Sequence, residues 1–319
     1  MSFTIRPAKR EGLHLLFGLS GGTGSGKTFT AMLIAAGLSA GEPFAVVDTE
    51  NGRASHYADD FRFDVVDLTA PYTPQRYQQA IDACVKGGRK VVVVDSMSHE
   101  WEGVGGLLEQ HDKLMGGNQN KNLSAWIQPK ADHRKFVNYL LQLDAHVILC
   151  FRAAEKVEAK RGADGKLEIV PKETLTGLDG WVPITEKSLP FELTASFLLT
   201  AARPGYPLPI KLQEQHRRLV PLDVPLSREV GVELAKWAAG AAAGEHEAEI
   251  KGLSDELLAC ADILGNRPQV LAAIAKNRRE HTTDLGKHVE WLNAQLHRLT
   301  DAVEAREDEQ IELPTGEEH

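Results

Sequence analysis

One eight-residue motif constrains this chain more than any other feature. Residues 21–28 read Gly-Gly-Thr-Gly-Ser-Gly-Lys-Thr and match the pattern GxxxxGK[ST] at every defined position. An apolar stretch, 13–20, precedes the motif, and an alanine-rich stretch, 27–40, follows it. This pattern has structural meaning when a strand runs into it and a helix runs out of it. The sequence therefore predicts a strand, a glycine-rich loop and a helix, in that order.

Such a loop binds phosphate. Its four glycines let the backbone fold so tightly that successive N–H groups point at one anion, and the following helix adds the positive end of its dipole. Lys27 supplies an ammonium group to the β- and γ-phosphates, and Thr28 supplies a hydroxyl to Mg²⁺. We therefore predict ATP and Mg²⁺ as cofactors. The predicted nucleotide-binding residues are Gly21, Gly22, Thr23, Gly24, Ser25, Gly26, Lys27 and Thr28.

A second apolar run ends in an acidic residue. Four consecutive valines, 91–94, precede Asp95 and Ser96, and a run without polar alternation is typical of a central strand covered on both faces. An aspartate at the carboxyl end of such a strand lies beside the phosphate loop, where it can hold the metal through water. We predict that Asp95 is the Walker B aspartate and joins Thr28 at the Mg²⁺ site.

The spacing of the apolar runs predicts an α/β fold with a mainly parallel central sheet. Short apolar segments alternate with longer amphipathic ones, which is the βαβ signature. Strands are expected at 13–20, 43–48, 63–68, 90–95 and 145–151, and helices at 27–40, 74–86, 103–115 and 123–143. A long polar stretch should follow to about residue 179, and then β-rich sequence at 191–200, 209–212 and 218–222.

The domain prediction divides the chain into five parts: an N-terminal extension 1–12, a core 13–238, a small and polar linker 239–247, a helical domain 248–303 and an acidic disordered tail 304–319. Apolar residues near the end step 4-3-4-3-4, as in a coiled-coil seam: Leu285, Val289, Leu292, Leu296, Leu299 and Val303. Because the seam is short, a three-helix bundle that packs on itself is the favoured interpretation.

The cysteines, the apolar stretches and the net charge each exclude certain classes of protein. The three cysteines, Cys84, Cys150 and Cys260, lie far apart, so neither a disulfide framework nor a zinc site is indicated. We find neither a secretory signal nor a stretch long enough to span a membrane, and we expect a cytoplasmic protein. The net charge of −9 argues against a protein that coats nucleic acid by charge alone, although a local basic groove is compatible with it.

Hydrolysis requires a group that orients or deprotonates the attacking water. Many AAA+ ATPases place a glutamate directly after the Walker B aspartate, but Ser96 stands there in this chain. The second predicted strand ends in Asp48-Thr49-Glu50. With this Asp-x-Glu arrangement and the Asp-Ser of Walker B, the chain resembles the RecA family. The resemblance implies a RecA-like P-loop NTPase in which Glu50 is the catalytic base, on a strand next to the phosphate-loop strand.

The resemblance also implies roles for cations. Arg152 ends the strand predicted at 145–151 and occupies the position of the γ-phosphate sensor, where the bacterial RecA proteins have glutamine. It joins Glu50 and Lys27 as a predicted catalytic residue, with DNA contact as the alternative. RecA-like proteins act as oligomers and send cations into a neighbour's ATP site. The candidates are Lys211, Arg217 and Arg218, with Lys187 behind them, and a solvated basic strand end is the open alternative.

A narrower resemblance concerns residues 180–194, Gly-Trp-Val-Pro-Ile-Thr-Glu-Lys-Ser-Leu-Pro-Phe-Glu-Leu-Thr. This run, with the sites above, is similar to phage-encoded RecA-core ATPases, some of which are single-strand annealing recombinases. It implies single-stranded DNA as a partner, a homo-oligomer, and a host cytoplasm if the chain is phage-encoded.

The DNA-facing segments would be 116–122 and 152–180, the second carrying Arg152, Lys156, Lys160, Arg161, Lys166 and Lys172. Trp126 and Trp181 are candidates for base stacking, although core packing is the preferred role for each. The alternative function is an ATPase motor or switch that acts on a protein partner through the C-terminal helices. A small-molecule kinase is a weaker alternative because of Glu50 and the strand-rich segment after Arg152.

Overall fold

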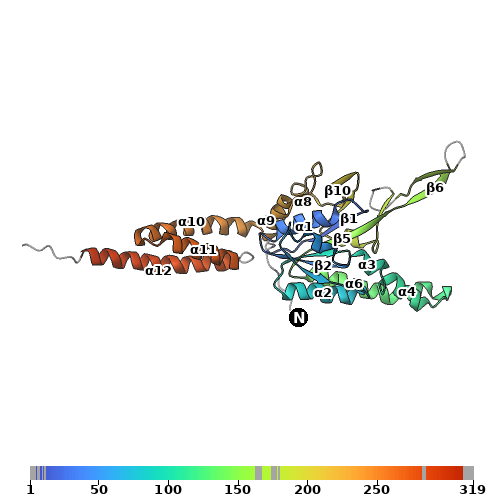
Figure 1. Cartoon of the computed structure of the whole chain (residues 1–319), viewed down its shortest axis with the longest axis horizontal. Helices are drawn as coiled ribbons and strands as arrows, with labels where there is room; N and C mark the ends of the chain where they lie inside the picture. Colours follow the sequence, from blue (N-terminus) through green and yellow to red (C-terminus); the bar gives the residue numbers. More distant parts are fainter. Residues whose placement is uncertain are drawn as a thin grey trace, which may run out of the picture. The chain divides into compact units, whose positions relative to one another are not determined.

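The computed structural model in Figure 1 describes residues 5, 8, 10, 12–161, 167–173, 178, 180–281 and 285–311. The chain divides into two compact units. One comprises residues 14–238, which we call the core unit, and the other contains the C-terminal helices from residue 239 together with the start of the chain. Most of the predicted N-terminal extension, 1–12, lies outside the described residues.

The core unit is built on a mainly parallel sheet in the order β10-β9-β1-β5-β4-β2-β3, with β8 paired to β5 off this path. Its strands are β1 (Leu16–Gly21), β2 (Phe44–Asp48), β3 (Phe63–Asp67), β4 (Val91–Asp95), β5 (His146–Glu155), β8 (Trp181–Pro183), β9 (Ala195–Thr200) and β10 (Arg203–Lys211). Only the β9–β10 and β5–β8 pairs of this sheet are antiparallel among the residues described. Strands β1, β2 and β4 are buried along their whole length, as aliphatic runs covered on both faces should be. The predicted α/β fold is confirmed.

The strand order corrects one expectation. We placed Glu50 on a strand next to the phosphate-loop strand, but β5 and β4 lie between β1 and β2. Strand order depends on long-range pairing, and a local apolar pattern carries no information about it. The carboxyl ends of these parallel strands still meet at one edge of the sheet, so residues that follow different strands come together there.

Helices cover both faces of the sheet. They are α1 (Lys27–Leu38), α2 (Pro74–Lys86), α3 (Ser98–Glu102), α4 (Leu107–Met115), α5 (Asn122–Ala125), α6 (Ile127–Gln142), α7 (Leu189–Glu192), α8 (Glu214–Arg217) and α9 (Arg228–Ala239), with 3-10 turns η1 (Arg53–Tyr57) and η2 (Gln119–Lys121). Helix α2 begins where Thr73 accepts a hydrogen bond from the Arg76 N–H and Pro74 takes the first helical position, which is a favoured start. The helix expected at 103–115 is α4 and begins only at Leu107, because the glycines at 103, 105 and 106 precede it, and α3 was not predicted.

Two hydrophobic cores fill the space between helices and sheet. Helices α1 and α9 pack on one face, through residues such as Ile34 and Leu234. Helices α2 and α6 pack on the other, through residues such as Tyr77 and Phe136. Helices α1 and α9 approach closely, since a Cβ atom at Gly37 would stand 2.1 Å from the carbonyl oxygen of Arg228.

The stretch after Arg152 differs from the prediction. Strand β5 continues to Glu155, and β6 (Val157–Arg161) and β7 (Leu167–Pro171) form an antiparallel hairpin, which we call the arm. In Figure 1 the arm stands away from the sheet. The strand expected at 218–222 is wrong, because the described chain makes turns there, and 191–200 begins as helix α7 before β9.

The C-terminal unit contains α10 (Ala241–Leu264), α11 (Arg267–Glu280) and α12 (Leu285–Ile311). The three helices share an apolar core whose buried members are Ile250, Leu257, Val289 and Leu292, with Leu296 and Leu299 packed against it. The predicted linker 239–247 is helical from Ala241 on, because alanine favours helix. The predicted disordered tail is helical as far as Ile311, and 312–319 lie outside the described residues. No helix in the described part of the chain could cross a bilayer.

Candidate functional site

The phosphate loop connects the end of β1 to the start of α1. Gly24 and Gly26 have φ angles of 76° and 82°, a left-handed conformation that favours glycine. The Lys27 Nζ donates a hydrogen bond to the Gly22 carbonyl oxygen at 3.0 Å, and the Ser25 Oγ donates to the same oxygen at 2.9 Å. A Cβ atom at Gly21 would stand 2.5 Å from the carbonyl oxygen of Leu199. The loop is thus tightly turned and leaves no room for a side chain at Gly21, as a phosphate-binding backbone loop requires.

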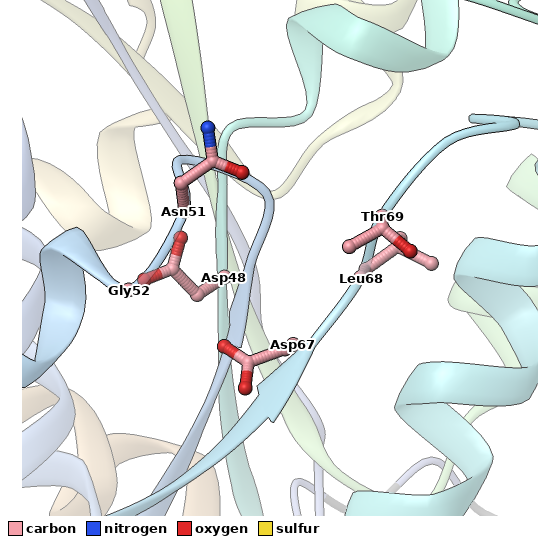
Figure 2. A pocket seen from close by; sticks show the side chains of 6 residues that line it. All are labelled: Asp48, Asn51, Gly52, Asp67, Leu68 and Thr69. Atoms are coloured by element: carbon pink, nitrogen blue, oxygen red, sulfur yellow. The ribbon is translucent and has the colours of Figure 1, made fainter.

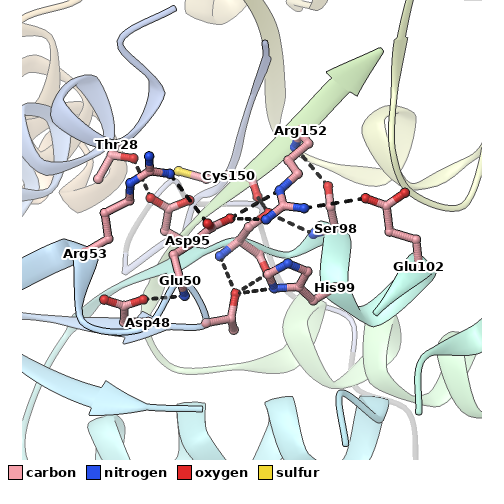
Figure 3. Close-up of polar contacts among 12 residues, drawn as sticks. Thr28, Asp48, Glu50, Arg53, Asp95, Ser98, His99, Glu102, Cys150 and Arg152 are labelled. Atoms are coloured by element: carbon pink, nitrogen blue, oxygen red, sulfur yellow. Dashed lines mark hydrogen bonds and ion pairs between the residues drawn. The ribbon is translucent and has the colours of Figure 1, made fainter. Parts of the chain in front are cut away.

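The two predicted metal ligands lie together at the carboxyl edge of the sheet. The Thr28 Oγ1 donates a hydrogen bond to the Asp95 Oδ2 at 2.5 Å, although β1 and β4 are not neighbours (Figure 3). Burial raises the pKa of Asp95 above its usual value, against the opposing effects of the Thr28 hydroxyl and the Lys27 ammonium. A hydroxyl and a carboxylate are hard oxygen ligands of the kind Mg²⁺ prefers, so these residues fit the predicted ion.

The predicted base and the predicted sensor form an ion pair. The Arg152 Nη2 donates to the Glu50 Oε1 at 2.6 Å, and its Nε donates to the same oxygen at 3.2 Å (Figure 3). The Arg53 Nη1 lies 3.5 Å from the other Glu50 oxygen, and the Glu102 Oε1 lies 3.8 Å from the Arg152 Nη1. Arg152 therefore contacts the base directly, which the sequence did not predict.

Asp48 anchors the turn that carries Glu50. Its carboxylate accepts hydrogen bonds from the backbone N–H groups of Glu50 at 2.6 Å and of Ala54 at 2.8 Å. The same side chain borders a hollow of about 350 Å³ at the ends of β2 and β3, lined also by Asn51, Gly52, Asp67, Leu68 and Thr69 (Figure 2). Since both of its oxygens hold backbone groups, Asp48 is a structural support for Glu50.

Helix α3 contacts the backbone of Arg152 and the residue next to Glu50, and so helps to position both partners of the ion pair. The Thr49 Oγ1 accepts from the Ser96 N–H at 2.8 Å and lies 2.8 Å from the His99 Nδ1. The Ser98 Oγ accepts from the Arg152 N–H at 2.9 Å. Burial and the Arg152 charge lower the pKa of His99, against the opposing charge of Glu50. The sequence analysis missed Thr49, Ser98 and His99 as site residues, and their only signal is their position beside Glu50 and Asp95.

The candidate DNA-contacting residues are spread over separate surfaces. Trp126 stacks with Trp101, with ring centroids 5.6 Å apart, and with His111 at 4.2 Å, so it is engaged in packing. Trp181 is half-buried at the root of the arm, and a Cβ atom at Gly22 would stand 3.5 Å from its ring. On the arm, Lys160 forms ion pairs with Glu158 at 3.0 Å and Glu173 at 2.7 Å. Lys166 lies outside the described residues.

The fold and the site together define a P-loop nucleotide-binding domain. The chain matches the family model described as AAA domain over residues 15–183, more than half of its length, and it belongs to that family. The matched region contains the phosphate loop, Glu50, Asp95 and Arg152. No curated protein matches the chain. The narrower grouping with phage recombinases stays a prediction.

Proposed function

We propose that this chain is a Mg²⁺-dependent ATPase whose catalytic base is Glu50. The observation that supports the proposal is the position of the Glu50 carboxylate, which lies at the same sheet edge as Asp95 and contributes to the raised pKa of that residue. The residue after Asp95 is the buried Ser96, whose hydroxyl contacts the Cys150 carbonyl oxygen. A serine held in this way is no general base. Of the two carboxylates whose charges raise the pKa of Asp95, Asp48 accepts backbone hydrogen bonds with both of its oxygens, which leaves Glu50.

In this proposal, each residue has a distinct role. The loop N–H groups and Lys27 would bind the phosphates, while Thr28 and Asp95 would hold Mg²⁺, which would neutralise charge on the phosphate oxygens. Arg152 leaves Glu50 and contacts the γ-phosphate, so that a Glu50 oxygen becomes available to take a proton from water. The ion pair at 2.6 Å thereby couples base activation to nucleotide binding.

The test is the Glu50→Gln variant, which keeps the shape of the side chain and removes its basicity. A fluorescent ATP analogue should bind this variant as it binds the wild type, while phosphate release falls by at least roughly 100-fold. Glu102→Gln is a matched control, because Glu102 also faces Arg152, though at 3.8 Å. Normal turnover by Glu50→Gln would assign the base to another residue.

For the partner, we propose single-stranded DNA, in the manner of a recombinase or annealing protein. The support is the resemblance of residues 180–194 and three exposed cations that follow Arg152, with Arg161 on the arm and Lys156 and Lys172 at its base. Phosphate contacts of this kind weaken steeply with salt. The ion pairs that already engage Lys160 reduce the positive charge available to DNA, so the alternative, a protein partner bound through the C-terminal helices, is tested beside it. Salt-dependent binding of a fluorescent oligonucleotide, with the ATPase rate measured with and without it, separates the two.

A further inference from the structure

Thr49 connects the turn that carries Glu50 to the end of strand β4. Its backbone N–H donates a hydrogen bond to the Asp95 carbonyl oxygen at 2.8 Å, and its hydroxyl oxygen accepts one from the Ser96 N–H at 2.8 Å. The residue is buried, with 3% of its surface exposed. Because Glu50 is the next residue in the chain, a shift of Thr49 relative to β4 would also shift the backbone of Glu50.

The hydroxyl proton of Thr49 has two acceptors within reach. One is the Ser96 carbonyl oxygen at 3.1 Å, and the other is the His99 Nδ1 at 2.8 Å. The Ser96 carbonyl oxygen already accepts a hydrogen bond from the Tyr77 hydroxyl at 2.8 Å, whereas Thr49 is the one hydrogen-bond partner of the His99 ring in the described part of the chain. A hydroxyl has a single proton to donate. The shorter contact therefore favours a neutral His99 ring that accepts this proton at Nδ1 and carries its own proton on Nε2.

The surroundings of His99 fix its ring and keep it neutral. The ring stacks on Tyr72, with centroids 4.8 Å apart and an angle of 29° between the planes. It also lies near the charges of Arg152, Glu50 and Glu102 (Figure 3). Burial lowers the pKa of His99 and the Arg152 charge lowers it further, against the opposing effects of the two carboxylates. The ring is therefore available as an acceptor near pH 7.

We infer that His99 is a positioning residue for Glu50 and acts through the Thr49 hydroxyl. The inference rests on the proposed ATPase function, in which Arg152 leaves Glu50. Both hydrogen bonds that hold the Glu50 carboxylate, at 2.6 and 3.2 Å, come from Arg152, so without them the carboxylate depends on the backbone of its turn. Asp48 holds this turn from within, whereas Thr49 and His99 attach it to β4 and α3. They thus keep Glu50 in place when it acts as the base.

The experiment compares His99→Leu with His99→Asn. Leucine accepts no hydrogen bond, but the Thr49 hydroxyl keeps the Ser96 carbonyl oxygen at 3.1 Å, so no buried hydroxyl is left without a partner and the variant should fold. His99→Leu should lower kcat by roughly tenfold to 100-fold, since a small misplacement of a catalytic group has an effect of this size. The KM for ATP should not change, because the phosphate loop is intact. Asparagine places an oxygen where the ring has Nδ1, so His99→Asn should restore most of the lost kcat.

The Thr49→Val variant tests whether His99 acts through the Thr49 hydroxyl. In this background His99→Leu should cause no further loss of kcat, because two residues that share one contact do not have additive effects. His297→Leu is the matched control, at a histidine of α12 whose side chain is 83% exposed, and it should behave like the wild type. Circular dichroism should show that the variants fold. Losses that multiply, a normal kcat in His99→Leu, or an asparagine variant no better than the leucine variant would overturn the inference.

Nitrogen NMR of isotope-labelled histidine provides a measurement without turnover. At pH 7 the His99 ring should carry its proton on Nε2, and its signals are identified by their loss in His99→Asn. A proton on Nδ1 would contradict the inference. Failure of the ATPase proposal is recognised separately, because normal turnover by Glu50→Gln would then be seen whatever the state of His99.

Discussion

Arg152 donates two hydrogen bonds to a single oxygen of Glu50, at 2.6 and 3.2 Å. A carboxylate oxygen held in this way is poorly placed to accept a proton from water, because its lone pairs face a guanidinium. The pairing joins the turn that follows β2 to a residue within β5, and β4 separates these two strands in the sheet. Arg152 can therefore act as a restraint on the base, as a group that stabilises the transition state, or as both.

Replacing Arg152 with alanine distinguishes these roles. If Arg152 contacts the γ-phosphate during turnover, Arg152→Ala should lower kcat by roughly 100-fold or more, since one lost electrostatic contact costs about that much. Arg53→Ala is the control, because Arg53 is exposed and lies 3.5 Å from Glu50, and it should change kcat little. The measurement is steady-state phosphate release. Faster turnover by Arg152→Ala would mean that the arginine only restrains Glu50.

The phosphate loop offers a direct test of the nucleotide site. Lys27→Ala removes the ammonium group that the loop directs toward the phosphates, and ATP hydrolysis should fall by at least roughly 100-fold. Lys90→Ala, at a surface lysine that pairs with Asp144 at 3.2 Å, should behave like the wild type. Full activity in a folded Lys27→Ala protein would show that the loop is not the site of turnover.

The metal requirement can be tested at Thr28. Thr28→Val keeps the volume and removes the hydroxyl that now contacts Asp95 at 2.5 Å, so half-maximal activity should need a Mg²⁺ concentration at least roughly tenfold higher. Thr28→Ser retains the hydroxyl and is the matched control. EDTA should abolish turnover by the wild type, and added Mg²⁺ should restore it. An unchanged Mg²⁺ dependence in Thr28→Val would remove Thr28 from the metal site.

Local sequence was sufficient to predict the features that depend on neighbouring residues alone. The glycines and Lys27 specify the phosphate loop because left-handed backbone and close packing require those residue types. Strands such as β2 and β4 fall within a residue of their predicted bounds, because unbroken aliphatic runs favour buried strands. The closeness of Thr28 and Asp95 was predictable because the loop that leads to Thr28 and the strand that ends in Asp95 meet at the carboxyl edge of the sheet.

Long-range features were not predictable in the same way. The order of β1, β5, β4 and β2 arises from pairing between distant segments, so the neighbours of Glu50 could not be read from the chain. The arm was missed although Val157 and Ile169 alternate with charged residues in the period-two pattern of a strand, because both runs are short and lie within a stretch that is polar as a whole. His99 has no motif of its own, and only the folded position of α3 brings it to Thr49.

The buried His146 predicts how the free energy of unfolding depends on pH. His146 begins β5, and its Nδ1 accepts a hydrogen bond from the Leu15 N–H at 3.1 Å. Burial lowers the pKa of His146 to about 4, and the nearby His14 adds to the effect. An unfolded histidine has a pKa of about 6.5. Between these pH values the unfolded chain binds a proton at His146 that the native protein does not. The contribution of neutral His146 to the free energy of unfolding is therefore fully present above about pH 6.5 and is lost as the pH falls toward about 4.

The expected loss is at most about 3 kcal/mol, because one pKa unit corresponds to about 1.36 kcal/mol. The His146→Gln variant keeps an acceptor for the Leu15 N–H and removes the titration. Its urea midpoint should therefore fall less between pH 7 and pH 5 than that of the wild type. Hydrogen exchange measured on peptides from β1 and β5 reports the stability of this region separately from that of the C-terminal unit. His56→Asn, at an exposed histidine, is the control, and equal pH slopes for His146→Gln and the wild type would contradict the prediction.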